Sequence, residues 1–79
     1  MAISRESLVA YLENEHGVDA ADLTDDAPLF SGGLLDSFSL VDLILFIEKG
    51  AGFKMNPTEV SLDNLDSIER ILGFVAARA

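Results

Sequence analysis

The sequence contains no cysteine and no tryptophan, one histidine, and only five lysine or arginine residues among 79. Without cysteine the chain can form neither a disulfide nor a thiolate metal site. A single histidine, His16, is too little evidence for a histidine-based metal centre or for a His-dependent catalytic triad. We expect His16 to lie in the last turn of the first helix, where the helix dipole favours positive charge.

Basic residues are outnumbered by fourteen acidic ones, which gives a net charge of −9. Nucleic-acid phosphates and anionic lipid headgroups would repel such a chain, so we expect neither as a partner. The longest apolar stretch, Leu34 to Ile47, contains Asp36 and Asp42 and is too short to span a bilayer. The first residues lack the pattern of a signal peptide, and we therefore expect a cytoplasmic location. We also expect a monomer.

The apolar content argues against disorder, because 49% of the residues are hydrophobic. A chain of this length has room for one domain, here residues 1–79, that buries roughly 60% of the surface exposed by the unfolded chain. The apolar residues must therefore be gathered inside and the acidic residues left outside.

Capping signals predict two long helices. Ser4 has the character of an N-cap, Ile3 and Leu8 have the spacing of a hydrophobic staple, and Gly17 has that of a C-cap. The second helix is expected to begin at Asp36-Ser37 and to run to about Lys49, with Gly50 and Gly52 ending it. The connection between the two helices is rich in aspartate and glycine, and its apolar residues are expected to fasten it to the core: Val18, Leu23, Leu29 and Phe30.

The acidic connection does not match a known ion or nucleotide motif. Its aspartate spacing lacks the pattern and the final bidentate glutamate of a helix–loop–helix calcium site. Gly32-Gly33 is not followed by the Gly-Lys-Ser/Thr of a phosphate-binding loop. We expect a solvated loop and no metal.

Two further helices are expected in the C-terminal third. Ser61 is expected to cap a short turn over Leu62 to Leu65, and Asp66 with Glu69 has the offset of a capping box that opens the last helix. An apolar i, i+3, i+4, i+7 pattern then runs to the end of the chain, at Ile68, Ile71, Leu72 and Val75. The predicted fold is all-α, a small four-helix bundle of three main helices and one short helix.

The second helix is apolar on two sides. Its core stripe is Leu40, Leu43, Ile44 and Ile47, and a second stripe on roughly the opposite side is formed by Phe38, Val41 and Leu45. Because a chain of this size cannot readily bury a helix on all sides, we interpret the second stripe as a contact surface. The alternative is that the connection covers Phe38 and Leu45.

Residues for catalysis are not apparent. Ser37 has no general base near it in the sequence, and Asp25 and Asp26 lie side by side in a loop without an apolar pocket to separate their pKa values. We expect no catalytic residues and no enzymatic activity.

The segment Leu34-Leu35-Asp36-Ser37-Phe38-Ser39-Leu40 resembles the attachment motif of acyl carrier proteins and of the related peptidyl and aminoacyl carriers. The resemblance extends over nearly the whole chain. It implies that Ser37 carries 4′-phosphopantetheine donated by coenzyme A, and that an acyl group is held as a thioester on its thiol. Asp36 would orient the helix start and help the phosphopantetheinyl transferase to dock.

The resemblance also gives the second helix a role in partner recognition. Phe38, Val41 and Leu45 would contact apolar pockets of partner enzymes, while Asp42 and Glu48 would meet basic residues. Those partners would be the transferase, an acyl- or aminoacyl-activating ligase, and acyltransferases or synthases.

Two departures from fatty acid synthesis carriers favour a discrete carrier of a specialised pathway. Leu34-Leu35 stands before Asp-Ser in place of the usual Gly-Ala, and only Asp42 and Glu48 are acidic in the second helix after the serine. One alternative is an aminoacyl carrier, including a D-alanyl carrier, charged by a stand-alone adenylating ligase. Another is an unmodified acidic helical adaptor.

Overall fold

A computed structural model describes residues 3–78, and in this range the chain is helical without any β-strand. The helices are α1 (Arg5–His16), α2 (Ser37–Ala51), α3 (Leu62–Leu65) and α4 (Ile68–Arg78). Two short 3-10 turns lie in the connections, at Ala20–Asp22 and Pro57–Glu59. The predicted all-α fold of three main helices and one short helix is confirmed.

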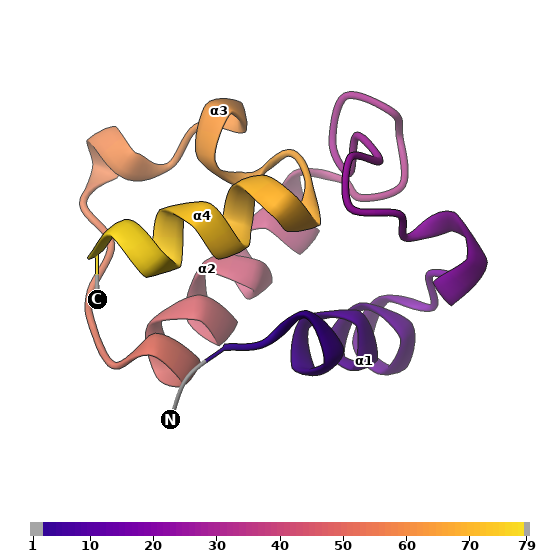
Figure 1. Ribbon diagram of the computed structural model, residues 1–79. Coiled ribbons are helices and arrows are strands. Elements are labelled where there is room, and N and C mark those ends of the chain that lie inside the picture. The colour runs from indigo at the N-terminus through magenta and orange to yellow at the C-terminus, as the bar shows by residue number, and fades with distance from the viewer. Residues whose placement is uncertain (1–2, 79) are drawn as a thin grey trace.

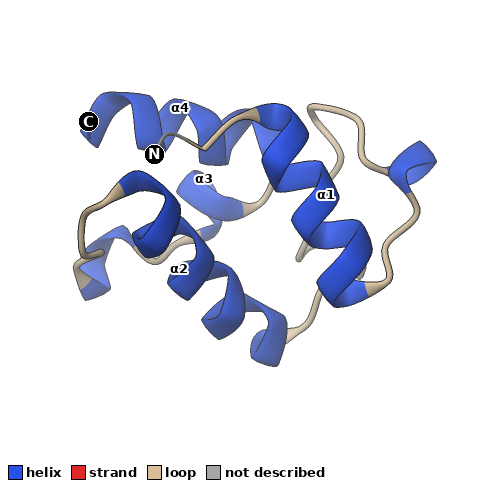
Figure 2. Cartoon of the chain, turned by 90° about the horizontal axis from the view of Figure 1, so that it is seen from below, coloured by secondary structure: helices blue, strands red, loops and turns tan. Residues whose placement is uncertain are grey.

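The helices surround one core. In Figure 1, α4 crosses in front of α2, with α3 above it and α1 below it. Viewed from below, the long α1–α2 connection forms one end of the molecule (Figure 2). All four helices and the connection contribute side chains to the core, which consists of Ile3, Leu8, Leu12, Val18, Leu23, Leu29, Leu35, Leu43, Ile47, Leu65, Ile68, Ile71 and Val75.

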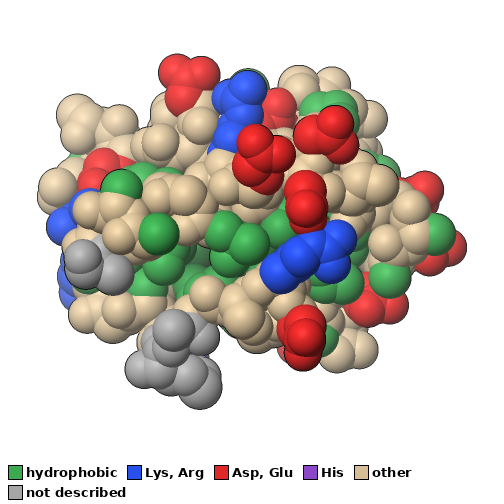
Figure 3. Space-filling model, viewed as in Figure 1, with side chains coloured by type: hydrophobic (Ala, Val, Ile, Leu, Met, Phe, Trp, Pro, Cys, Tyr) green, Lys and Arg blue, Asp and Glu red, His purple; other side chains and the backbone are tan. Residues whose placement is uncertain are grey.

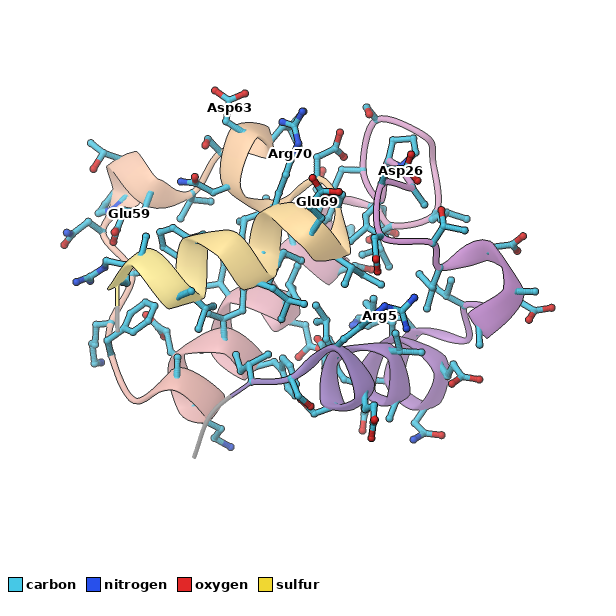
Figure 4. The ribbon with its side chains drawn as sticks, viewed as in Figure 1. Arg5, Asp26, Glu59, Asp63, Glu69 and Arg70 are labelled. Carbon is cyan, nitrogen blue, oxygen red and sulfur yellow. The ribbon has the colours of Figure 1, made fainter. Side chains whose placement is uncertain are left out.

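The connection is fastened to the bundle as expected. Val18, Leu23 and Leu29 are buried, and Phe30 is half-buried against the same core. Arg5 adds a polar contact from α1, because its guanidinium pairs with the carboxylate of Asp25 and donates to the Leu23 carbonyl at 3.3 Å. Figure 4 shows the Arg5 side chain reaching from α1 toward the connection. The connection is therefore part of the packed structure.

Local capping signals fix both ends of α1. The Ser4 hydroxyl accepts from the Ser7 amide at 3.1 Å, which confirms Ser4 as the N-cap. Gly17 ends the helix in the left-handed region with φ of 65°, a conformation in which glycine meets no Cβ penalty. Ile3 and Leu8 are both buried, as a hydrophobic staple requires.

The expected caps of α3 and α4 need correction. Ser61 occupies the N-cap position of α3, but its side chain makes no capping hydrogen bond. Asp66 does not cap α4, because its carboxylate is directed to the α1–α2 connection. The hydroxyl of buried Ser67 accepts from the Arg70 amide at 3.1 Å instead. The Asp66–Glu69 capping box is therefore wrong.

Gly50 does not end α2, which contradicts the expectation. The helix continues through Ala51 and ends at Gly52, whose φ is 80°. Gly50 is buried, and a Cβ atom at this position would lie 2.6 Å from Cγ1 of Ile3. The missing side chain thus lets the segment before α1 pack closely against α2.

The two glycines inside helices should respond oppositely to alanine. Gly50→Ala gains about 1 kcal/mol of helix propensity, but overpacking against Ile3 costs about 1–3 kcal/mol, so the free energy of unfolding should fall. Gly73 in α4 is exposed, and a Cβ atom at this position would have no neighbour within 4 Å. Gly73→Ala should therefore raise the free energy of unfolding by about 0.5–1 kcal/mol. Urea denaturation measures both, and a stabilised Gly50→Ala protein would contradict the close packing.

Candidate functional site

Asp36 and Ser37 begin α2 at the point where the connection reaches the bundle. Asp36 is the N-cap, and its Oδ1 accepts from the Ser39 amide at 2.9 Å and from the Ser39 hydroxyl at 3.0 Å. These hydrogen bonds, that of the amide first, lower the pKa of Asp36 below its usual value. The predicted role of Asp36 in orienting the helix start thus has a geometric basis.

Ser37 is the first residue of α2, and its side chain is exposed. Beside it lies an open surface hollow with a mixed, mainly apolar lining, formed by Phe30, Leu35, Asp36, Ser37, Leu40 and Leu62. The positive end of the helix dipole favours an anionic group at this position. The site can therefore accept a phosphate on the serine oxygen, with an apolar surface next to it.

The second apolar stripe of α2 is exposed. The exposed fractions are 87% for Phe38, 60% for Val41 and 54% for Leu45. The alternative that the connection covers Phe38 and Leu45 is therefore wrong. Leu62 of α3 is also exposed, by 48%, and it shares the hollow beside Ser37.

Asp42 belongs to a polar cluster that joins α1 to α2. Its Oδ2 accepts from the Tyr11 hydroxyl at 2.9 Å and lies 3.2 Å from Nε2 of His16. The same His16 nitrogen is 2.8 Å from the Tyr11 hydroxyl oxygen. Burial, and then the hydrogen bond and negative charge of Asp42, raise the pKa of Tyr11. His16 lies in the last turn of α1 as expected, but its cross-helix contacts were not foreseen.

Glu48 also has a partner within the chain. This half-buried side chain accepts from the Met55 amide at 2.9 Å. It thereby holds the segment that follows α2. The same region is also fastened to α4, because Arg78 pairs with Glu59 at 2.7 Å and lies 4.5 Å from the centroid of the Phe53 ring. Of the two acids predicted to meet partners, Asp42 is the more exposed.

The charged surface is uneven. Acidic side chains are spread over the end of the molecule formed by α1 and the connection (Figure 3). Within residues 3–78, the acidic and histidine side chains do not form a group that could hold a metal ion. No helix in the same range is long and apolar enough to cross a bilayer.

Comparison with known proteins shows the family to which this chain belongs. Residues 6–75 match the family described as "Phosphopantetheine attachment site". The chain is also 36% identical over 53 residues to a "D-alanyl carrier protein" of Abiotrophia defectiva, an alignment that covers 67% of each protein. The chain belongs to the acyl and peptidyl carrier protein family.

The prosthetic group of this carrier protein is covalently attached 4′-phosphopantetheine. The residues present at the start of α2 fit this group, because an exposed hydroxyl, a helix N-terminus and an apolar hollow lie together there. When bound, the group supplies the thiol that cysteine-free residues 1–79 cannot provide.

The Tyr11 hydroxyl offers a direct test of the contact between α1 and α2 in the carrier. Tyr11→Phe removes its hydrogen bond to Asp42 but keeps the ring, which is stacked on Phe46 with 4.1 Å between centroids. The free energy of unfolding should fall by about 0.5–1.5 kcal/mol. Asp42→Asn keeps an acceptor oxygen for the Tyr11 hydroxyl, so its free energy of unfolding should fall by less than that of Tyr11→Phe. Urea denaturation at neutral pH that shows no loss for Tyr11→Phe would contradict a stabilising role.

Proposed function

We propose that this protein is a discrete, non-catalytic carrier that holds an acyl or aminoacyl group as a thioester on 4′-phosphopantetheine attached to Ser37. The observation that supports this most strongly is the exposed Ser37 hydroxyl at the first residue of α2, inside the range matched by the attachment-site family. The proposal includes a cytoplasmic location and a monomeric state.

Ser37 would act as the phosphate acceptor. Its Oγ forms the new bond to phosphorus, the pyrophosphate bond of coenzyme A breaks, and adenosine bisphosphate leaves. The hydroxyl proton passes to a base of the transferase. Asp36 keeps the start of α2 ordered through Ser39 while the hydroxyl remains accessible.

Partner enzymes would bind the exposed stripe of α2. Phe38, Val41 and Leu45 offer apolar area that is already free in the described structure. Apolar contacts supply affinity, whereas the acidic end of the molecule speeds encounter with basic partners. Asp42 would take part from the edge of the stripe, where its side chain is 53% exposed. Glu48 would contribute less to binding, because the Met55 amide already occupies its carboxylate.

The attachment residue can be identified by mass. Incubation with coenzyme A and a broad-specificity phosphopantetheinyl transferase should add one arm to the wild-type protein and none to Ser37→Ala. Ser39→Ala is the matched control, since it removes a neighbouring hydroxyl and should still be modified. A wild-type protein that gains no arm, or a modified Ser37→Ala protein, would contradict the proposal and favour the unmodified helical adaptor.

Within this function, D-alanine or another amino acid is the cargo that the comparison favours. The supporting observation is the 36% identity to a protein named a D-alanyl carrier protein. A stand-alone adenylating ligase would join the amino acid to ATP as an aminoacyl adenylate and release pyrophosphate. The thiol of the arm would then take the aminoacyl group from the adenylate and release AMP.

Cargo can be separated from attachment by offering the modified carrier D-alanine, L-alanine or a fatty acid in parallel, each with ATP and candidate ligases. We expect a thioester with D-alanine, detected as an added alanyl mass that hydroxylamine removes. Ser37→Ala should remain uncharged. Charging only with fatty acids would contradict the aminoacyl assignment while leaving the carrier role intact.

A further inference from the structure

Asp66, between α3 and α4, fastens the connection that leads to Ser37. Its Oδ1 accepts from the amides of Phe30 at 2.8 Å and Ser31 at 3.0 Å. Its Oδ2 accepts from the Ser31 hydroxyl at 2.7 Å. The Asp66 backbone carbonyl accepts from the Leu29 amide at 2.6 Å. One residue thus satisfies three consecutive backbone amides of the connection.

The fastened segment is joined directly to the start of α2. The Leu29 carbonyl accepts from the Leu35 amide at 2.8 Å, and both side chains are buried in the core. Leu35 immediately precedes Asp36 and Ser37. Between Leu29 and Leu35 the chain turns back on itself, with the Gly33 amide donating to the Phe30 carbonyl at 3.2 Å. A path of hydrogen bonds therefore runs from Asp66 to the residue before the cap.

The electrostatics favour this arrangement with Asp66 ionised. Desolvation by burial raises the pKa of Asp66, but the hydrogen bonds from Ser31 and Phe30 and the charge of Arg70 outweigh it, so the pKa lies below its usual value. Hydrogen bonds to a charged acceptor are stronger than those to a neutral one. The neighbouring acid, Asp63, differs because its side chain is 98% exposed and lies 3.7 Å from Arg70 at the surface. Figure 4 shows Asp63 and Arg70 on the outer side of α3 and α4.

We propose that Asp66 is a positioning residue for modification of Ser37: it holds the turn formed by residues 29–35, and the turn holds the start of α2 in the conformation that the transferase binds. This inference rests on the proposed attachment of the arm to Ser37. Loss of the carboxylate leaves the chemistry of Ser37 unchanged but lowers the fraction of molecules with a competent helix start. A smaller competent fraction raises the apparent KM for the carrier and leaves kcat largely unaffected.

The test compares transferase kinetics of apo-carrier variants. For Asp66→Ala we expect the KM for the carrier to rise by at least about tenfold, because the variant loses three hydrogen bonds of ordinary net strength, with kcat within about twofold of wild type. Asp63→Ala makes the same change of charge at an exposed site and should match wild type. Ser31→Ala, which removes one of the bonds and leaves the backbone amides in place, should give a smaller rise, about threefold.

Amide hydrogen exchange separates local positioning from general destabilisation. In Asp66→Ala, exchange should accelerate at Phe30, Ser31 and Leu35 while the amides of α1 retain their protection. If Asp66→Ala does not fold, Ser31→Ala decides the matter, and a wild-type KM for that variant overturns the inference. Unchanged KM for a folded Asp66→Ala protein also overturns it while leaving the proposed function in place. A wild-type protein that accepts no arm on Ser37 overturns the proposed function itself.

Discussion

The hydrogen bonds between Asp66 and residues 29–31 are the interaction on which the arrangement at Ser37 depends. The connection between α1 and α2 is long, and fixing its backbone costs conformational entropy. Buried Leu23 and Leu29 offset part of this cost through the core. Asp66 also determines the path of the connection, because its hydrogen bonds set how the chain turns before α2 begins. The fold thus presents the exposed Ser37 hydroxyl from a backbone that is held by the connection before this residue and by α2 after it.

The distribution of apolar surface follows from the small size of the chain. The inner face of α2 buries Leu43 and Ile47, and this leaves Phe38, Val41 and Leu45 in solvent. A carrier protein must bind several enzymes in turn, and an exposed apolar stripe beside the proposed attachment residue suits brief, modest contacts. Seven of the fourteen acidic residues belong to α1 and the connection before Asp36, at Glu6, Glu13, Glu15, Asp19, Asp22, Asp25 and Asp26. The proposed long-range attraction and the proposed close contact with partners would therefore involve different parts of the molecule.

Local signals in the sequence predict the four helices, apart from the caps of α3 and α4 and the end of α2, and they indicate the proposed site. Ser4 and Gly17 delimit α1, Asp36 caps α2, and the two apolar stripes of α2 follow from helical periodicity. Each of these features is determined by residues that are close in the sequence. Ser37 itself is indicated by its position after Asp36 and by the resemblance to carrier proteins, and its role stays a prediction.

The features that were missed depend on contacts between distant residues. Asp66 has the spacing of a helix cap, but tertiary contacts direct its carboxylate to Phe30 and Ser31 instead. Asp42 meets Tyr11 across 31 positions of sequence, and Gly50 lies within α2 at a position where Ile3 packs against the helix. Periodicity and capping rules describe single segments, so none of these pairings had a signal that sequence reasoning could use.

The central claim is that Ser37 is presented by a preformed site, and amide NMR spectra of the carrier before and after phosphopantetheine transfer test it most directly. The expected result is that resonance changes are confined to Ser37 and its surroundings, including Phe30, Leu35, Leu40 and Leu62, while the amides of α1 and the second half of α4 stay in place. Changes throughout the core, or changes centred on a residue other than Ser37, would contradict it.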